Sequence, residues 1–408
     1  MSRDSGTRTA GPAGVDDALS AAAILQRLLP PDVASLFDAS YLRMHLLYDE
    51  FIYRLVLRTA AETGLEAATR EPGTVEEIAV CAGFEAPRAL VPLDWMLRLL
   101  AARGLVEETP GGGASRYRSL RVFPSLDPAP VSGEQKRLDA SWIPAYTLAE
   151  TVARDYPAFL RGRVTGEEVL FSPRRLRLWI DYFSNDNGLY VVNNRLGALA
   201  VEQWLPRPGG TILELGGGLG SGALALLERL EAADRLGEIA EYRFTEFVPA
   251  FLRRGEQALR ARLPDVSRAS FGPLDMNRAF GDQGVPPGSV SVVYAVNTLH
   301  VARDLDFTLG EILRVLEPGG RLILSECVRS HARQPIESEF VFNLTETFRS
   351  PQLHPRYRPS GGFLTPGQWK DAMETAGFVD IRFLPDIVKV HEQAPRFIAA
   401  AIGASRSG

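Results

Sequence analysis

A short apolar strand that runs directly into a string of glycines constrains the fold of this 408-residue chain more than any other segment. The run from Thr211 to Gly222 reads TILELGGGLGSG, and a helical pattern follows it. A side chain at Gly216, Gly218 or Gly220 would hold the backbone away from a ligand or prevent the tight turn. The run therefore predicts a strand, a ligand-binding loop and a helix in that order.

The spacing of these glycines decides between two classes of ligand. A dinucleotide fingerprint needs glycine at its first, third and sixth places, and the sixth place counted from Gly216 is Ser221. The pattern E-x-G-x-G-x-G is complete, from Glu214 through Gly216 and Gly218 to Gly220. It resembles the first motif of class I methyltransferases, which bind S-adenosylmethionine (SAM) in a Rossmann-like fold. The resemblance implies that Glu214 reaches the methionine amino group. The alternative is a structural carboxylate that bonds loop amides, and the two roles are compatible.

Two later segments supply the acids that such a cofactor needs. The run EYRFTE ends at Glu246, and an acid at the carboxyl end of the second strand can accept hydrogen bonds from both ribose hydroxyls. The run FGPLDM resembles the third element of the family. This implies that Asp275 meets the adenine amino group and that Met276 covers the ring. The expected product of the cofactor is S-adenosylhomocysteine.

The middle of the chain also resembles the C-methyltransferase domains of polyketide synthases. The run from Asp275 to Val285 and three others keep that family's order and approximate spacing, and the resemblance covers about residues 190–330. The three others are FTEFVPAFL at 244–252, AVNTLH at 295–300 and LEPGGRLILSE at 316–326. The resemblance implies that His300 is a general base and that Glu326 orients it. Asn297 is expected at the cofactor site, where it either orients the substrate or fixes the turn after its strand.

The strand pattern brings the same two residues together. Residues 290–296 and 322–325 are apolar runs typical of buried parallel strands, and in this fold they are neighbours about 4.8 Å apart. Groups at their carboxyl ends, His300 and Glu326, can therefore meet at the ligand crevice. The alternative is that His300 only packs against the cofactor and that Glu326 caps backbone amides.

Composition excludes several other classes of function. The formal net charge is -5, so a slightly acidic surface opposes binding to a phosphate backbone. No run of Lys or Arg suggests such a partner either. Cys81 and Cys327 lie outside any Cys/His cluster, so neither a metal site nor a disulfide is expected, and a reducing cytoplasm fits. No apolar run is long enough to span a membrane.

The N-terminal part resembles the winged-helix dimerisation module of small-molecule O-methyltransferases. Thr74 and Glu77 have capping-box spacing, and residues 105–108 and 116–119 fit the two strands of a wing. The resemblance implies a homodimer. The last helix before the wing carries few base-reading side chains, so DNA binding is not expected. The chain is expected to divide into four parts: a disordered leader (1–16), a helical and winged-helix-like domain (17–123), a helical linker or lid (124–205) and a SAM-binding domain (206–408).

Aromatic residues outside the motifs are candidates for substrate contact. Tyr190, just before the cofactor strand, is the best candidate in the linker. Residues 331–363 lack periodicity and could cover an acceptor pocket. Residues 387–390 and 397–402 are expected as a closing pair of strands. In the N-terminal helices, four residues either reach a substrate or belong to a core or interface: Tyr41, His45, Tyr48 and Tyr53.

The sequence thus predicts an α/β chain with a seven-stranded SAM-methyltransferase sheet behind a mainly helical N-terminal domain. The expected reaction is methyl transfer to a small-molecule natural product, free or carrier-tethered, with a ketide-like carbon favoured over a hydroxyl oxygen. Two alternatives remain open: an O-methyltransferase of a phenol or enol metabolite, and a SAM-fold protein with a non-methylating activity.

Overall fold

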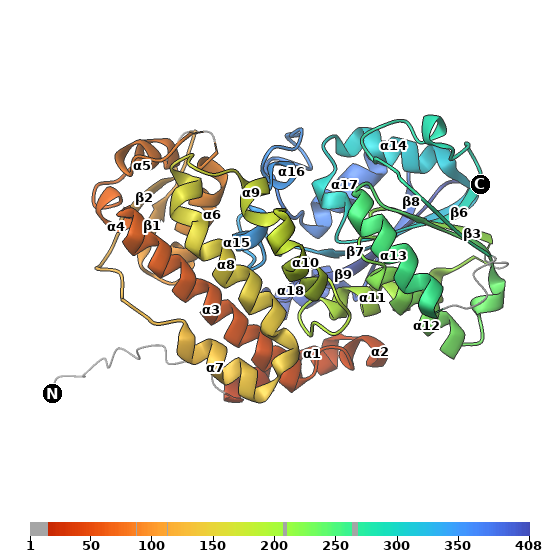
Figure 1. The fold of residues 1–408 in the computed structure, drawn as a ribbon, viewed down its shortest axis with the longest axis horizontal. Coiled ribbons are helices and arrows are strands. Elements are labelled where there is room, and N and C mark those ends of the chain that lie inside the picture. The colour runs from red at the N-terminus through yellow and green to blue at the C-terminus, as the bar shows by residue number, and fades with distance from the viewer. Residues whose placement is uncertain (1–14, 87, 112, 207–209, 263–267) are drawn as a thin grey trace.

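The C-terminal half is built on one twisted sheet of seven strands in the order β5-β4-β3-β6-β7-β9-β8 (Figure 1). The computed structural model describes residues 15–408, except 87, 112, 207–209 and 263–267. All neighbouring strands from β5 to β7 are parallel, and β9 runs antiparallel to both β7 and β8. The strands are β3 (Gly210–Glu214), β4 (Ile239–Thr245), β5 (Ala269–Gly272), β6 (Val290–Val296), β7 (Leu316–Cys327), β8 (Val379–Leu384) and β9 (Ala399–Ser405).

Helices cover both faces of this sheet, as right-handed crossovers between parallel strands require. On one side α11, α12 and α13 pack in a row, and on the other side α14 packs against α17. Both ends of α17 are capped, because Thr365 forms a capping box with Gln368 at the start and Gly377 takes a left-handed φ of 100° at the end. The helices are α11 (Val191–Trp204), α12 (Ser221–Ala232), α13 (Pro249–Arg262), α14 (Leu305–Val315), α17 (Pro366–Ala376) and α18 (Ile387–Gln393).

The closing strand pair differs from the prediction. Residues 387–390 form the first turn of α18 instead of a strand, and the last pair is β8 with β9. Asp386 caps this helix, since its Oδ1 accepts a hydrogen bond from the Lys389 amide at 3.3 Å. A capped amphipathic turn explains the β-branched run, because Ile387 and Val390 are buried while Val388 is 56% exposed.

The N-terminal half is helical apart from one hairpin. The strands β1 (Val106–Thr109) and β2 (Arg116–Ser119) pair antiparallel, as predicted. The predicted capping box of Thr74 and Glu77 begins α5. Residues 1–14 of the expected leader lie outside the described residues, and α1 begins at Val15. The helices are α1 (Val15–Leu28), α2 (Pro31–Ala34), α3 (Ala39–Thr63), α4 (Leu65–Ala68), α5 (Val75–Cys81), α6 (Leu90–Ala102), α7 (Ala129–Leu138), α8 (Ile143–Leu160), α9 (Gly166–Leu170) and α10 (Leu176–Tyr182).

Two large hydrophobic cores divide the chain, and each draws on distant segments. The sheet core includes Leu25, Leu29, Val33 and Phe37 from α1 and α2 and the loop that follows. The helical core includes side chains from α3 to α10 and also Phe340 from α15 (Glu339–Phe342). Figure 1 shows α15 and α16 (Glu346–Arg349), late in the sequence, beside the early helices α6 and α9. The predicted division into separate domains stays a prediction.

Candidate active site

A cavity of about 450 Å³ lies where the sheet meets the helical half, at the carboxyl ends of β3, β4, β6 and β7. Parallel α/β sheets bind their ligands at this edge. The glycine loop, the helical half and the segment after β7 all contribute to its wall. Among the predicted site residues it is lined by Glu214, Gly216, Gly218, Glu246, Asp275, Met276, Asn297, His300 and Tyr190.

The glycine loop has the close backbone approach that the sequence predicts. Gly216 and Gly218 both take left-handed φ values, 61° and 58°. A β-carbon on Gly216 would lie 2.5 Å from Cγ2 of Thr298, which follows β6. Any larger residue would therefore push the glycine loop away from this segment. Gly220 does not line the cavity. It precedes α12 with φ 87°, and its β-carbon would lie 3.2 Å from the Gly255 backbone.

Glu214 ends β3 as a buried carboxylate, 2% exposed, and lines the cavity. Its Oε2 accepts a hydrogen bond from the Tyr242 hydroxyl at 3.0 Å. Burial raises the pKa of this carboxyl to about 8 from an ordinary 4.5, the Tyr242 hydrogen bond opposes that rise, and the nearby Glu246 adds to it. A buried acid of this kind favours a cationic partner, because a positive charge nearby restores the ionised form.

Glu246 follows β4 and binds the glycine loop directly. Its Oε2 accepts from the Gly218 amide at 2.9 Å, and its Oε1 accepts from the Val248 amide at 2.7 Å. Burial raises the pKa of this carboxyl, while the backbone hydrogen bonds of Val248, Gly218 and Phe247 lower it. The carboxylate is therefore fixed in one orientation at the cavity wall, with lone pairs left for a ligand.

Asp275 and Met276 occupy the turn after β5. The Asp275 amide donates to Gln283 Oε1 at 2.8 Å, and Asp275 Oδ1 accepts from the Asn277 amide at 2.9 Å. The Met276 carbonyl accepts from Thr308 Oγ1 at 3.0 Å. These bonds fix a turn whose acid and apolar side chain both face the cavity.

His300 and Glu326 form the pair that the two strands predict. His300 Nδ1 lies 2.7 Å from Glu326 Oε2, and both side chains are buried. The other oxygen, Oε1, accepts from the amides of Thr298 and Leu299 at 3.1 and 2.9 Å. Glu326 is fully buried behind the imidazole and does not line the cavity, whereas His300 does. We assign the Nδ1–H tautomer because a carboxylate only accepts, which leaves Nε2 as an unprotonated nitrogen.

Asn297 has the one strained backbone in this site. Its φ is 48°, in the left-handed region, and its amide donates to the Ser325 carbonyl at 2.8 Å. Its Oδ1 is buried without a hydrogen-bond partner. Buried polar atoms are rarely left unpaired, so this oxygen at a cavity wall indicates a bound group that donates to it.

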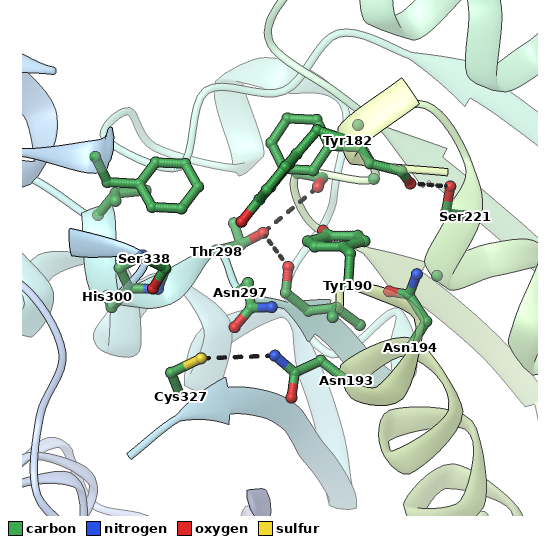
Figure 2. A pocket seen from close by; sticks show the side chains of 18 of the residues that line it. Tyr182, Tyr190, Asn193, Asn194, Ser221, Asn297, Thr298, His300, Cys327 and Ser338 are labelled. Atoms are coloured by element: carbon green, nitrogen blue, oxygen red, sulfur yellow. Dashed lines mark hydrogen bonds between the residues drawn. The ribbon is translucent and has the colours of Figure 1, made fainter. Parts of the chain in front are cut away.

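Two further cavity residues were not predicted. Asn193 and Asn194 lie in the first turn of α11, and the Oδ1 of each is buried without a partner. The side-chain nitrogen of Asn193, Nδ2, lies 3.6 Å from the Cys327 sulfur. The side-chain nitrogen of Asn194 donates to Asn185 Oδ1 at 2.8 Å. Figure 2 shows Asn193, Asn297 and Tyr190 facing the same space. The signal in the sequence was only an Asn-Asn pair within a helical pattern.

These orphaned oxygens, the left-handed glycines and the buried acids together fit SAM. The cofactor carries an ammonium, ribose hydroxyls and an adenine amino group, and each is a hydrogen-bond donor that such oxygens accept. The residues that would hold it are Glu214, the glycine loop, Glu246, Asp275, Met276, Asn297, Asn193 and Asn194.

Aromatic side chains from the helical half form another part of the cavity wall. Tyr190 packs on Phe183, with ring centroids 5.0 Å apart, and Trp179 stacks on Phe183 at 5.1 Å. The segment after β7 supplies Phe342 and Phe363, as expected for residues 331–363, although that segment contains the short helices α15 and α16. Tyr41, His45 and Tyr48 also line the cavity, whereas Tyr53 lies under the Arg103 guanidinium at 4.5 Å.

The described residues also bear on two other kinds of site. No group of three or more His, Cys, Asp or Glu side chains there is arranged to hold a metal ion. No helix in the same part of the chain has both the length and the apolar character needed to cross a bilayer.

Comparison with known proteins identifies the sheet half. Residues 213–322 match a family described as a methyltransferase domain. The reducing polyketide synthase Preu2 of Preussia isomera is 29% identical over 256 residues, which are 62% of this chain and 10% of that protein. The chain thus spans about a tenth of the length of this curated relative.

Two solved structures share the fold over almost the whole chain. The CurJ carbon methyltransferase has a TM-score of 0.75 at 21% identity, covering 96% of this chain and 99% of that one. The DszA carbon methyltransferase has a TM-score of 0.69 at 25% identity, covering 96% of this chain and 94% of that one. The chain therefore contains a SAM-dependent methyltransferase domain, built on the fold that these carbon methyltransferases share.

Proposed function

We propose that this protein transfers a methyl group from SAM to an acidic carbon of a small ketide-like acceptor, with His300 as the general base. The observation that carries the proposal is the 2.7 Å contact between His300 Nδ1 and Glu326 Oε2 at the cavity wall. It leaves Nε2 as the basic nitrogen of a residue that lines the cavity and provides a carboxylate for the imidazolium that forms.

The cofactor, when bound, supplies an electrophilic methyl group on a sulfonium. The residues of this chain supply position and a proton acceptor. Glu246 and the Gly218 amide hold the loop in one arrangement, and Glu214 provides a carboxylate for a cationic group. The aromatic wall of Trp179, Phe183 and Phe342 keeps water from the acceptor, which favours an in-line displacement.

A carbon atom is favoured over an oxygen atom as the methyl acceptor because an imidazole such as that of His300 is a base of moderate strength. A carbon between a keto group and a thioester carbonyl is acidic enough for an imidazole to deprotonate. The polyketide synthase relative and the two carbon methyltransferase folds support the same choice. We extend the proposal to acceptors tethered to a carrier as thioesters, since such a tether leaves the acidic carbon free.

The homodimer and the cytoplasmic location stay predictions from the N-terminal resemblance and the cysteine usage. Light scattering coupled to size-exclusion chromatography measures the first directly. A mass of about 45 kDa, that of one 44.7 kDa chain, would contradict the dimer.

The test of the reaction uses SAM labelled with ¹³C in its methyl group and a 3-oxoacyl thioester of N-acetylcysteamine. The expected product is heavier by one methyl group, and its ¹³C resonance lies in the range of a methyl on carbon. A methyl resonance in the methoxy range would replace C-methylation by O-methylation. Consumption of neither reactant, with acceptor binding intact, would favour a non-methylating role.

A further inference from the structure

A second polar cluster lines the cavity, formed by one face of α3 and by the segment before α15. Tyr41, His45 and Tyr48 follow one another at helical spacing on that face, and Glu337 and Ser338 stand opposite. Nothing in the proposed proton transfer or in the cofactor site uses these side chains. The two parts lie far apart in the sequence, at residues 41–48 and 337–338, so only the fold brings them together.

The two ionisable members of this cluster face each other without a direct bond. His45 Nε2 lies 3.9 Å from Glu337 Oε2, and the two side chains are 18% and 17% exposed. That distance exceeds hydrogen-bond reach. The neighbouring acid Asp49 is already paired, because Arg103 Nη2 lies 2.7 Å from its Oδ2. His45 and Glu337 therefore keep hydrogen-bonding capacity toward the cavity.

Two hydroxyl groups beside them also lack partners. Tyr48 Oη and Ser338 Oγ are buried and make no hydrogen bond. Burial raises the pKa of Tyr48 well above its usual range, so its hydroxyl stays protonated and can donate. Ser338 is among the cavity residues labelled in Figure 2. Unpaired buried hydroxyls at a cavity wall indicate a polar group of the bound molecule.

We propose that His45, Glu337, Tyr48 and Ser338 form a subsite that binds a hydroxyl group of the acceptor, away from the carbon that is methylated. The inference rests on the proposed ketide-like acceptor and adds that the acyl chain of this acceptor carries a hydroxyl group. A hydroxyl oxygen at about 2.8 Å from both groups accepts from His45 Nε2–H and donates to Glu337 Oε2. An apolar chain at the same place would leave all four polar groups unpaired.

The subsite separates hydroxylated acceptors from their deoxy counterparts. Hydrogen bonds to a charged group discriminate more strongly than neutral ones, so the hydroxylated acceptor should bind about 10- to 100-fold more tightly. His45 and Glu337 act on affinity for the acceptor and not on the cofactor, because neither belongs to the glycine loop or to the acids of β3 and β4.

The experiment is calorimetric titration of the full chain saturated with S-adenosylhomocysteine. The probes are 3-oxoacyl thioesters of N-acetylcysteamine that carry a hydroxyl at carbon 5, 7 or 9, each with its deoxy counterpart. At least one hydroxylated member should bind about 10-fold or more tightly than its counterpart. Glu337→Met should abolish that ratio, and Glu337→Gln, which keeps an acceptor oxygen, should restore part of it. Glu392→Gln, an exposed change of the same kind, should leave the ratio unchanged.

Two outcomes would overturn the proposed subsite. They differ in whether the proposed methyl transfer fails with it. Equal binding within every pair overturns the subsite, and if mass spectrometry still shows a methylated deoxy thioester, the proposed function stands. Absence of binding by every thioester overturns both. Affinity for S-adenosylhomocysteine should be the same in wild type and Glu337→Met, which shows that the variant is folded.

Discussion

The guanidinium of Arg358 holds the backbone of His300, with 2.7 Å between Arg358 Nη2 and the His300 carbonyl oxygen. Its Nη1 donates to the Ala302 carbonyl at 2.6 Å. These bonds hold the middle residue of the 3-10 turn Leu299–Val301, which carries the imidazole, and the residue that follows the turn. Burial lowers the pKa of Arg358 to about 10, so the group stays charged at neutral pH and the bonds are charge-assisted.

Arg358→Lys should therefore lower kcat about 10-fold, and Arg358→Met should lower it further. A lysine ammonium is a point charge that cannot reach both carbonyls with the geometry of a fork. Affinity for S-adenosylhomocysteine should change little, because Arg358 does not line the cavity. Steady-state kinetics with a 3-oxoacyl thioester and calorimetry give the two values. A normal kcat in Arg358→Met would show that the turn holds its place unaided.

His300→Ala should reduce kcat by about 100-fold or more, the contribution expected of a positioned base. Glu326→Gln should reduce it less and change its pH profile, because the amide keeps the shape but removes the charge that favours the imidazolium. Steady-state assays from pH 6 to 9 measure both. Equal loss of cofactor affinity and turnover in His300→Ala would instead place His300 in the cofactor site.

Glu246→Ala should weaken binding of S-adenosylhomocysteine by about 10- to 100-fold. The substitution removes a charged acceptor for the ligand and also frees the Gly218 amide that the carboxylate now holds. Calorimetry measures the affinity, and Glu392→Ala on the surface of α18 is the control. Unchanged affinity would mean that the carboxylate only supports the loop.

The raised pKa of Glu214 predicts how stability depends on pH. The folded-state pKa of about 8 lies above the ordinary 4.5, so folding favours the protonated carboxyl. This contribution is complete below pH 4.5 and is lost as the pH rises through 8, at up to about 1.4 kcal/mol per pH unit. The Tm of wild type should therefore fall more steeply than that of Glu214→Gln over this window. Scanning fluorimetry measures both curves, and parallel curves would refute the assignment.

A bound ligand with an ammonium group should have an effect of opposite sign on the pH dependence of stability. An ammonium near Glu214 stabilises the ionised carboxylate, so S-adenosylhomocysteine should raise the Tm of wild type more at pH 8.5 than at pH 6. The pH dependence of this shift should be smaller in Glu214→Gln.

Gly197→Ala should lower the free energy of unfolding by about 1–3 kcal/mol, an overpacking cost. A β-carbon at this position in α11 would lie 2.7 Å from the Tyr294 hydroxyl and 3.0 Å from Ser325 Cβ. Gly367→Ala in α17 is the matched control, since no heavy atom would lie within 4 Å of its β-carbon. That control should be neutral or slightly stabilising, because alanine favours helix. Urea denaturation measures both variants.

The motifs at the glycine loop and at the strand ends could be predicted because each is local. A glycine whose φ must be positive, or an acid that ends a strand, is visible within a few residues, and Gly218 and Glu246 lie where the sequence predicts. The His300–Glu326 contact was predictable for a related reason, since adjacent parallel strands bring their carboxyl ends together. The roles of these residues remain predictions for the experiments above.

The acceptor side could not be predicted in the same way. The contact between His45 and Glu337 depends on how the two cores meet, and no local pattern encodes it. Asn193 and Asn194 lie side by side in a helix, where polar residues usually face solvent, yet both are buried. The β-branched run at 387–390 was assigned wrongly because a strand and a short buried helix give the same pattern over so few residues.

The chain contributes to the two cores alternately, and this arrangement has a consequence for how the protein unfolds. The chain enters the sheet core at α1, crosses to the other core at α3, returns at α11 and crosses again at α15 before it ends in β9. A cut between the halves would remove part of the packing of each, so neither fragment retains a complete interior. Denaturation should follow a single cooperative transition, and circular dichroism and tryptophan fluorescence should report the same midpoint.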